Sequence, residues 1–127
     1  MKESVRGVLS KEGYLVYLEP QFAPSRFLSW EFYRPDMLGV RAADGRQEYA
    51  IVECETRPSQ RRLAGKNYRS LQVQTRLNSE LRLRRILVIP RGTLARVHPS
   101  VRLSWETWIF GDGSFQLLPQ VAPVRGS

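Results

Sequence analysis

Apolar residues recur along the chain with two periods, one typical of helices and one typical of strands. Residues 3–12 carry Val5, Val8 and Leu9 at helical spacing, and Gly13 follows them as a helix stop. Shorter runs rich in strand-forming residues come next, and turn-forming residues separate them: residues 14–18, 30–40, 48–55 and 85–90. The pattern predicts one helix followed by three strands, and a further strand later in the chain.

The segments between the strands indicate how the strands pair. Asp44 and Gly45 form a favourable two-residue turn, so residues 30–40 and 48–55 are expected to make an antiparallel hairpin. Ser59 offers a cap for a long helix over residues 60–82, in which leucines recur among Arg, Gln and Asn. A helix between two apolar strands predicts a parallel crossover. Weaker signals indicate a short helix or turn at 94–97 and strands at 103–110 and 115–118.

These elements predict an α/β fold, a single domain over residues 1–118 with a central mixed sheet flanked by helices. The Pro/Gly/Ser-rich residues 119–127 are expected to form a flexible tail. Composition agrees, because 127 residues with 42% hydrophobic and 25% charged side chains are typical of one globular domain. No apolar run approaches the roughly 20 residues of a spanning helix, and no signal peptide is evident. We therefore expect an intracellular protein, cytoplasmic or nucleoid-associated, with no membrane contact.

Charge and cysteine content restrict the chemistry. The chain has 20 Lys+Arg against 12 Asp+Glu, a net charge of +8, and all but three of the basic residues are arginine. Because guanidinium binds phosphate in a planar fork, this balance favours a phosphate or nucleic-acid binder. The alternative is a solubilising basic surface. With Cys54 the only cysteine and His98 the only histidine, an internal disulfide is excluded and a zinc site nearly so. No small-molecule cofactor is expected.

Acidic residues gather at one end of the predicted hairpin. In the strand over 48–55, Glu53 and Glu55 share one face, while Ala50, Val52 and Cys54 share the other. Two neighbouring carboxylates repel each other unless positive charge lies between them.

Asp36 lies about eight positions before the hairpin turn and Glu53 about eight after it, so the two are expected to be cross-strand neighbours. Three carboxylates at one sheet end would suit Mg²⁺ or Mn²⁺, ions that assist phosphodiester hydrolysis. The alternative is that Glu53 and Glu55 pair with Arg57, Arg61 and Arg62 on a solvated edge.

The sequence resembles the PD-(D/E)XK nuclease superfamily over residues 1–90. The matching features are Pro35 with Asp36, then the apolar strand that leads to Glu53 and Glu55, and the order of helix, three strands, long helix and strand. The first residues, with Glu3 early on the first helix, are similar to archaeal Holliday-junction resolvases. The resemblance implies a restriction-endonuclease-like core, Mg²⁺ or Mn²⁺ held by Asp36 and Glu53 with Glu3 assisting, a DNA substrate and a homodimer.

One position departs from this family. The superfamily usually carries lysine two residues after the strand glutamate, where this chain has Glu55. Lys66 in the following helix, or Arg57 and Arg61, is expected to supply the missing cation. Some restriction enzymes of the superfamily carry glutamate at this position and use it as a ligand or base. The alternative is a non-cleaving member retained for binding.

The long helix offers further candidates. Tyr68 and Gln72 lie one turn apart and are possible supports for the metal site. Trp105 and Trp108 lie on opposite faces of a late strand, so one is expected to be exposed, for contact with a second copy or for stacking on an unpaired base. The residues expected to bind DNA phosphates are Arg57, Arg61, Arg62, Arg69 and Arg76.

Together these features predict a metal-dependent DNA endonuclease, with branched recombination or repair intermediates as candidate substrates. Asp36, Glu53, Glu55 and Lys66 would form its catalytic group. The first alternative is a nucleic-acid-binding module without catalysis on the same fold. A lesser alternative is a basic subunit of a ribonucleoprotein, in which the acids would not meet.

Overall fold

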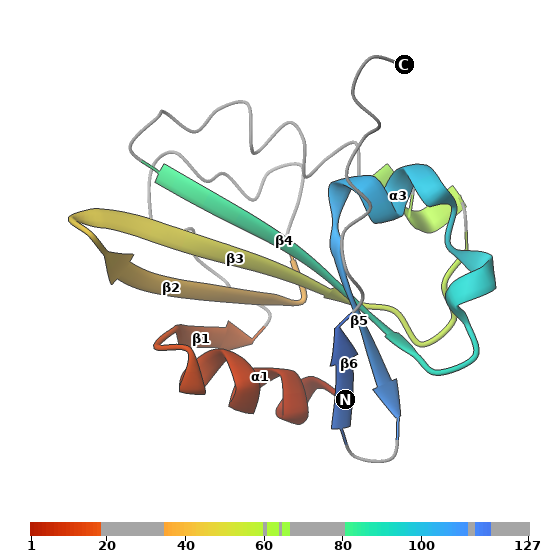
Figure 1. The fold of residues 1–127 in the computed structure, drawn as a ribbon, viewed down its shortest axis with the longest axis horizontal. Helices are drawn as coiled ribbons and strands as arrows, with labels where there is room; N and C mark the ends of the chain where they lie inside the picture. The colour runs from red at the N-terminus through yellow and green to blue at the C-terminus, as the bar shows by residue number, and fades with distance from the viewer. Residues whose placement is uncertain (19–34, 60, 64, 67–80, 112–113, 118–127) are drawn as a thin grey trace.

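The computed structural model is an α/β domain built on a six-stranded mixed sheet, as the sequence predicts (Figure 1). The structure describes residues 1–18, 35–59, 61–63, 65–66, 81–111 and 114–117. The strands lie in the order β1-β2-β3-β4-β5-β6, with β3–β4 and β4–β5 parallel and the other neighbours antiparallel. The elements are α1 (Lys2–Lys11), β1 (Leu15–Leu18), β2 (Met37–Ala43), β3 (Arg46–Cys54), β4 (Leu81–Pro90), η1 (Leu94–Arg96), α3 (Pro99–Ser104), β5 (Glu106–Gly111) and β6 (Ser114–Leu117). The expected tail lies outside the described residues.

Local sequence signals explain the first half of the sheet. After α1 ends, Gly13 adopts φ +93°, a left-handed conformation in which glycine has no steric penalty. The β2–β3 hairpin turns through Asp44 and Gly45, both at positive φ, which is the backbone of a type I′ turn. Because this turn fixes the register, the expected hairpin pairing is confirmed, with Met37 opposite Val52.

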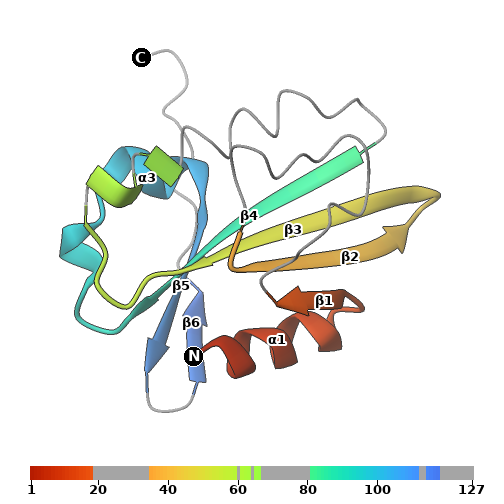
Figure 2. The ribbon, with the colours of Figure 1, turned by 180° about the vertical axis from the view of Figure 1, so that it is seen from behind.

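The sheet is buried on both faces, and each face has its own apolar core. One core packs α1 against the sheet and contains Val5, Leu9, Ala50, Val52, Ile86, Val88 and Trp108 among others. The other lies under α3 and the residues that follow β3, and it includes Leu38, Tyr49, Ile51, Leu63, Leu87, Ile89, Val101 and Trp105. Figure 2, from behind, again shows α1 and α3 well apart across the sheet. Burial on both faces explains why β3 and β4 read as continuous apolar runs.

The long helix predicted over residues 60–82 is too long at its C-terminal end. Residues 61–63 and 65–66 are helical, and most of the remainder lies outside the described residues. Residues 81 and 82, however, belong to β4 and pair in parallel with Gln47 and Glu48. Leu83 packs against the core under α3, whereas Arg84 forms ion pairs with Glu12 and Glu106. This period-two alternation is a strand signal that the leucine spacing obscured.

The strand predicted at 103–110 also begins later than expected, because α3 occupies residues 99–104. Pro99 is at the first helical turn, and the His98 side chain caps it by accepting a hydrogen bond from the Ser100 amide at 3.1 Å. Trp105 and Trp108 do lie on opposite faces, but both are buried, at 2% and 1% exposure. Neither is therefore available for a dimer contact or base stacking. Within the described part of the chain, no helix has the length and apolar character needed to cross a membrane.

Candidate functional site

The carboxyl end of β3 holds two buried glutamates. Glu53 and Glu55 share the strand face of Tyr49 and Ile51, and Glu55 extends the pairing beyond the strand by donating its amide to the Val88 carbonyl at 2.9 Å. Each glutamate is only 2% exposed. The solvated edge of the alternative interpretation is therefore wrong for these two residues, although one of its ion pairs, Arg62 with Glu55, is present. Because β3, β4 and β5 run parallel, their carboxyl ends meet at this edge of the sheet, where α/β folds commonly bind ligands.

Lys66 supplies the positive charge that these carboxylates require. Its ammonium nitrogen Nζ lies 2.6 Å from Oε2 of Glu53 and also contacts Oε1 of Glu55. The helical turns that carry Lys66 begin as the sequence predicts, with Ser59 Oγ accepting the Arg62 amide at 3.3 Å. Leu63, 2% exposed, anchors these turns in the core under α3. We refer to Glu53, Glu55 and Lys66 as the carboxylate–lysine cluster.

Burial and close ion contacts oppose each other in this cluster. Removing charges from water costs several kcal/mol per ion, by order of magnitude, and only close partners offset the cost. Burial alone would lower the pKa of Lys66, but the hydrogen bonds to Glu53 and Glu55 outweigh it, so the pKa is raised. Lys66 is therefore protonated at neutral pH and neutralises about half of the charge on the two glutamates. Arg62 adds a weaker contact, with Nη2 3.5 Å from Oε2 of Glu55.

Asp36 lies at the same end of the sheet, one position before the pair Met37–Val52. Its Oδ2 accepts a hydrogen bond from the Cys54 amide at 2.8 Å, so the carboxylate is held directly beside the strand that carries Glu53. The hairpin therefore brings Asp36 and the β3 glutamates to one end of the sheet, as the residue count from the turn predicted.

A divalent ion was expected here, with Glu3 assisting. Glu3 is exposed on α1, and the described residues contain no group of three or more His, Cys, Asp or Glu side chains arranged to hold an ion. The expected meeting of three metal-ligating acids is thus not seen in this part of the chain. The carboxylate oxygens of Asp36 and Glu53 are nevertheless of the hard donor type that Mg²⁺ and Mn²⁺ prefer.

The surroundings of Cys54 should make its thiol unreactive. Burial, reinforced by the negative charge of Asp36, raises the pKa of Cys54 to about 12. Because the thiolate is the reactive form, alkylation of the folded protein with iodoacetamide at pH 8 should be at least about a hundredfold slower than that of a free thiol. Mass spectrometry with and without urea measures the rate. Equal rates for the folded and the unfolded chain would contradict this placement of Cys54.

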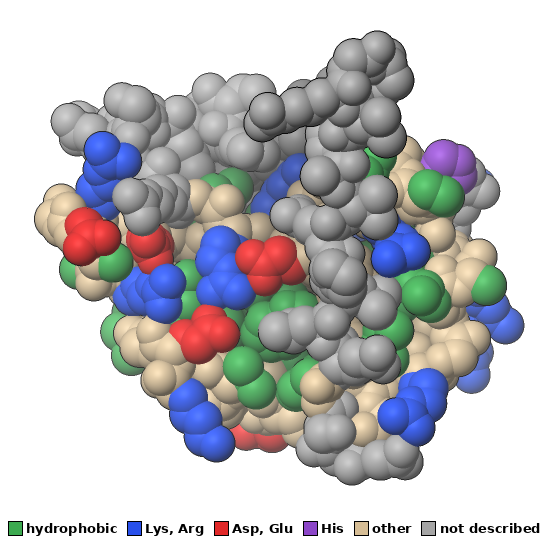
Figure 3. Space-filling view, in the orientation of Figure 1, with side chains coloured by type: hydrophobic (Ala, Val, Ile, Leu, Met, Phe, Trp, Pro, Cys, Tyr) green, Lys and Arg blue, Asp and Glu red, His purple; other side chains and the backbone are tan. Residues whose placement is uncertain are grey.

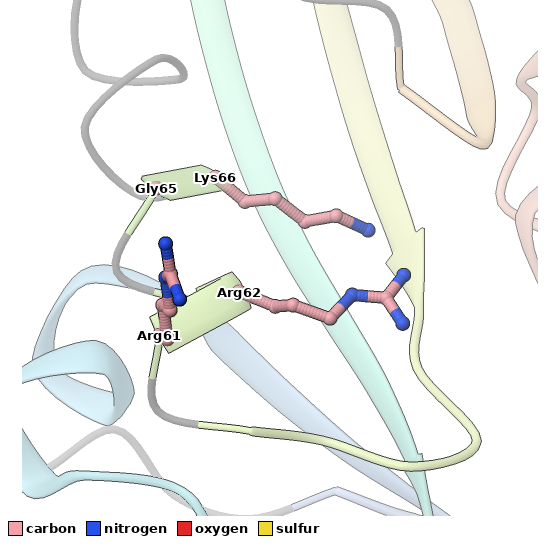
Figure 4. Close-up of a pocket in the computed structure, with 4 residues that line it drawn as sticks. All are labelled: Arg61, Arg62, Gly65 and Lys66. Atoms are coloured by element: carbon pink, nitrogen blue, oxygen red, sulfur yellow. The ribbon is translucent and has the colours of Figure 1, made fainter.

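Three of the predicted phosphate-binding arginines are described, and all three are exposed: Arg57, Arg61 and Arg62. Arg61, Arg62, Gly65 and Lys66 line a pocket of about 290 Å³. Figure 4 shows the side chains of Arg62 and Lys66 extending side by side toward β3, while that of Arg61 points in another direction. The pocket thus joins the carboxylate–lysine cluster to two exposed guanidinium groups. Four further candidates lie outside the described residues: Tyr68, Arg69, Gln72 and Arg76.

Two buried polar residues on the same face of the sheet were missed by the sequence analysis. Arg85 is 9% exposed and stacks over the Trp105 ring, 5.4 Å from its centroid. Thr107 lies opposite Leu87 on the neighbouring strand, and Leu87 in turn lies opposite Glu53. The buried hydroxyl of Thr107 has no hydrogen-bond partner among the described residues. A pattern of alternating faces along β4 and β5 would have placed both residues on the side of Glu53.

On the α1 side of the sheet, arginine has a structural role. Arg84 pairs with Glu106 and Glu12, and the hydrogen bond to Glu106 is the main cause of its raised pKa. Arg41 pairs with Glu48 at 2.6 Å and lies over the Tyr14 ring. On the face shown in Figure 3, acidic and basic side chains interleave and do not form one large basic patch. Part of the arginine excess therefore stabilises the fold, and the pocket beside Lys66 stands out as cationic.

Comparisons with known proteins agree on the fold. No protein-family model matches the sequence, and no curated protein matches it. Two crystal structures are similar: an XisH family protein from Nostoc punctiforme, at 15% identity, TM-score 0.52 and coverage of 92% of this chain and 97% of that one, and an FdxN element excision controlling factor protein from Anabaena variabilis, at 14% identity, TM-score 0.52 and coverage of 93% and 97%. At these identities the similarity shows that the chain shares the α/β fold of these proteins over nearly its full length.

Proposed function

We propose that this protein is a metal-dependent DNA endonuclease whose catalytic group comprises Asp36, Glu53, Glu55 and Lys66. The observation that carries the proposal is the contact of one lysine ammonium with two glutamates that are each 2% exposed. A buried ion cluster of this kind is weak evidence for a stabilising role, since apolar residues of similar volume often serve as well. Buried ionisable groups at the carboxyl ends of parallel strands are typical of functional sites.

The cluster supplies the cation that the β3 sequence lacks. The nuclease superfamily that the sequence resembles usually carries lysine at the position of Glu55, and here an ammonium from residue 66 contacts Glu55 itself. In the proposed site, Lys66 orients the attacking water and balances the charge that develops on the phosphate. Glu55 holds Lys66 in place, and the neighbouring arginines bind the strand.

Asp36 and Glu53 would hold Mg²⁺ or Mn²⁺. When bound, such an ion polarises the phosphate and lowers the pKa of a water molecule. The hydrogen bond from the Cys54 amide to Asp36 keeps that carboxylate at the end of β3, so the two donors are oriented before an ion arrives. The name of the similar Anabaena variabilis protein, an FdxN element excision controlling factor, refers to excision, and a role of that kind is compatible with cutting DNA.

One observation favours a second candidate function, a binding module without catalysis. Within the described residues no three acidic side chains form a group able to hold an ion, and Glu55 is already occupied by Lys66 and Arg62. A neutralised cluster beside exposed arginines would serve for binding phosphate alone.

Cleavage assays separate the two functions. The protein should cut supercoiled, linear or branched DNA in Mg²⁺ or Mn²⁺, and Asp36→Ala and Glu53→Gln should each reduce the rate by at least about a hundredfold. Both variants should still bind DNA, because the phosphate contacts come from other residues. Gel electrophoresis of the products and fluorescence anisotropy of labelled DNA measure the two activities.

Glu12→Gln is a matched control, since Glu12 is a partly exposed carboxylate on the α1 side of the sheet, far from Glu53 in sequence. We expect it to cut at the wild-type rate. Salt-sensitive binding without cutting in either metal, unchanged by Asp36→Ala, would reject the nuclease and support the binding module.

A further inference from the structure

The pocket beside the carboxylate–lysine cluster has a size and a positive charge that favour a phosphate group as its ligand. Its described lining consists of Arg61, Arg62, Gly65 and Lys66, and its volume is about 290 Å³. Three of these four residues are cationic, and none is acidic. A space of this size accommodates a phosphate group. Guanidinium and ammonium groups are the donors that bind phosphate oxygens.

The charge balance distinguishes between classes of phosphate. Arg61, Arg62 and Lys66 carry three positive charges, and Glu53 and Glu55, which contact Lys66, carry two negative ones. Counted over these five side chains alone, the pocket lining and the two glutamates that contact it, one positive charge remains in the absence of a metal. That matches a phosphodiester, which carries one negative charge, more closely than a terminal phosphate, which carries about two near neutral pH.

We propose that this pocket binds a single internal phosphodiester group of a DNA strand, and that the absence of a side chain at Gly65 keeps it open. The identity of the strand rests on the proposed function, whereas the pocket itself rests on its residues. Arg62 and Lys66 extend together toward β3 (Figure 4), so a phosphate bound between them would lie next to Glu53 and Glu55. The pocket therefore positions one phosphate of the strand at the end of β3 without contacting a base.

Gly65 allows a steric test that leaves every charge in place. A Cβ built at Gly65 meets no atom within 4 Å, and the residue is helical. A side chain introduced there would enter open space without displacing the protein, and it would remove the entropic penalty of glycine in a helix. Gly7 is a matched control, because it is also helical, is exposed on α1 and has no atom within 4 Å of an added Cβ.

The experiment measures binding of a fluorescein-labelled single-stranded octathymidylate by anisotropy, in EDTA so that cleavage plays no part. Gly65→Gln should weaken binding by about tenfold or more, whereas Gly7→Gln should bind as the wild type does. Replacing the phosphodiesters of the strand with uncharged methylphosphonates should cause at least as great a loss. Thermal unfolding by circular dichroism should show that both glutamine variants are folded.

Equal binding by wild-type protein and Gly65→Gln would overturn the proposal that this pocket binds DNA, whatever the cleavage assays show. A second arm tests the charge assignment with two competitors, dimethyl phosphate and inorganic phosphate. Competition by both, or by dimethyl phosphate alone, supports a phosphodiester site. Competition by inorganic phosphate alone would overturn that assignment in favour of a terminal phosphate. If Gly65→Gln fails to bind DNA and the wild type binds but does not cut, the proposed phosphodiester site is supported and the proposed nuclease activity is rejected.

Discussion

Replacing Lys66 with methionine should lower the free energy of unfolding by about 3 kcal/mol near neutral pH. Methionine keeps much of the side-chain volume but removes the ammonium, which leaves Glu53 and Glu55 next to each other at 2% exposure. Arg62 lies 3.5 Å from Glu55 and most of its side chain is exposed, so it compensates little. Urea denaturation followed by fluorescence measures the difference. DNA cleavage should be lost in the same variant.

Two further variants show whether the negative charge of the two glutamates causes the loss of stability in Lys66→Met. Combining Lys66→Met with Glu53→Gln and Glu55→Gln should recover most of the lost stability, because the cluster then carries no charge. Lys11→Met, at an exposed position in the last turn of α1, should leave stability within about 0.5 kcal/mol of the wild type. If Lys66→Met is as stable as the wild type, the ion contacts seen in the cluster make no net contribution.

The pH dependence of this effect has a definite sign. The pKa of Lys66 is raised in the folded protein, so its contribution to stability is fully present below the ordinary value of 10.5 and is lost only as the pH rises above it. Wild-type protein should therefore show no loss from this group between neutral pH and pH 10.

Local signals were sufficient to predict the half of the fold that positions the acids. Asp44 and Gly45 fix the hairpin register, and counting from that turn placed Asp36 at the end of β3. Alternation along β3 placed Glu53 and Glu55 on one face and Ala50 and Val52 on the other. These inferences held because a two-residue turn and a period of two leave few alternatives.

Other features depend on contacts between segments far apart in sequence. Nothing local distinguishes the buried glutamates from a solvated pair, because Lys66, which contacts both, lies more than ten residues away in the chain. The sequence offered Lys66, Arg57 and Arg61 as sources of the cation, and only the fold singles out Lys66 as the residue in contact with both acids. The boundaries near residues 81 and 105 were misjudged for the same reason, since strand pairing and the His98 cap override propensity.

Exchanging the charges of residues 55 and 66 should have the second large effect, and it tests the origin of the cluster directly. Lys66→Glu places a third carboxylate beside Glu53 and Glu55, and should destabilise the fold by more than about 4 kcal/mol. Glu55→Lys places two ammonium groups beside Glu53 and should be less severe, because Lys66 is partly exposed. The double variant, Glu55→Lys with Lys66→Glu, restores one cation and two anions. The loss of unfolding free energy in the double variant should be about 3 kcal/mol smaller than the sum of the losses in the two single variants.

The double variant also moves lysine to the position two residues after the strand glutamate, where the resembled nucleases carry it. If the ammonium needs only to lie beside Glu53 and the phosphate, the double variant should still cut DNA, whereas each single variant should not. A double variant that is as stable as the wild type but inactive would show that the ammonium must come from residue 66. Since Lys66 also lines the phosphate pocket, binding of DNA by the double variant would then distinguish loss of the pocket from loss of the catalytic group.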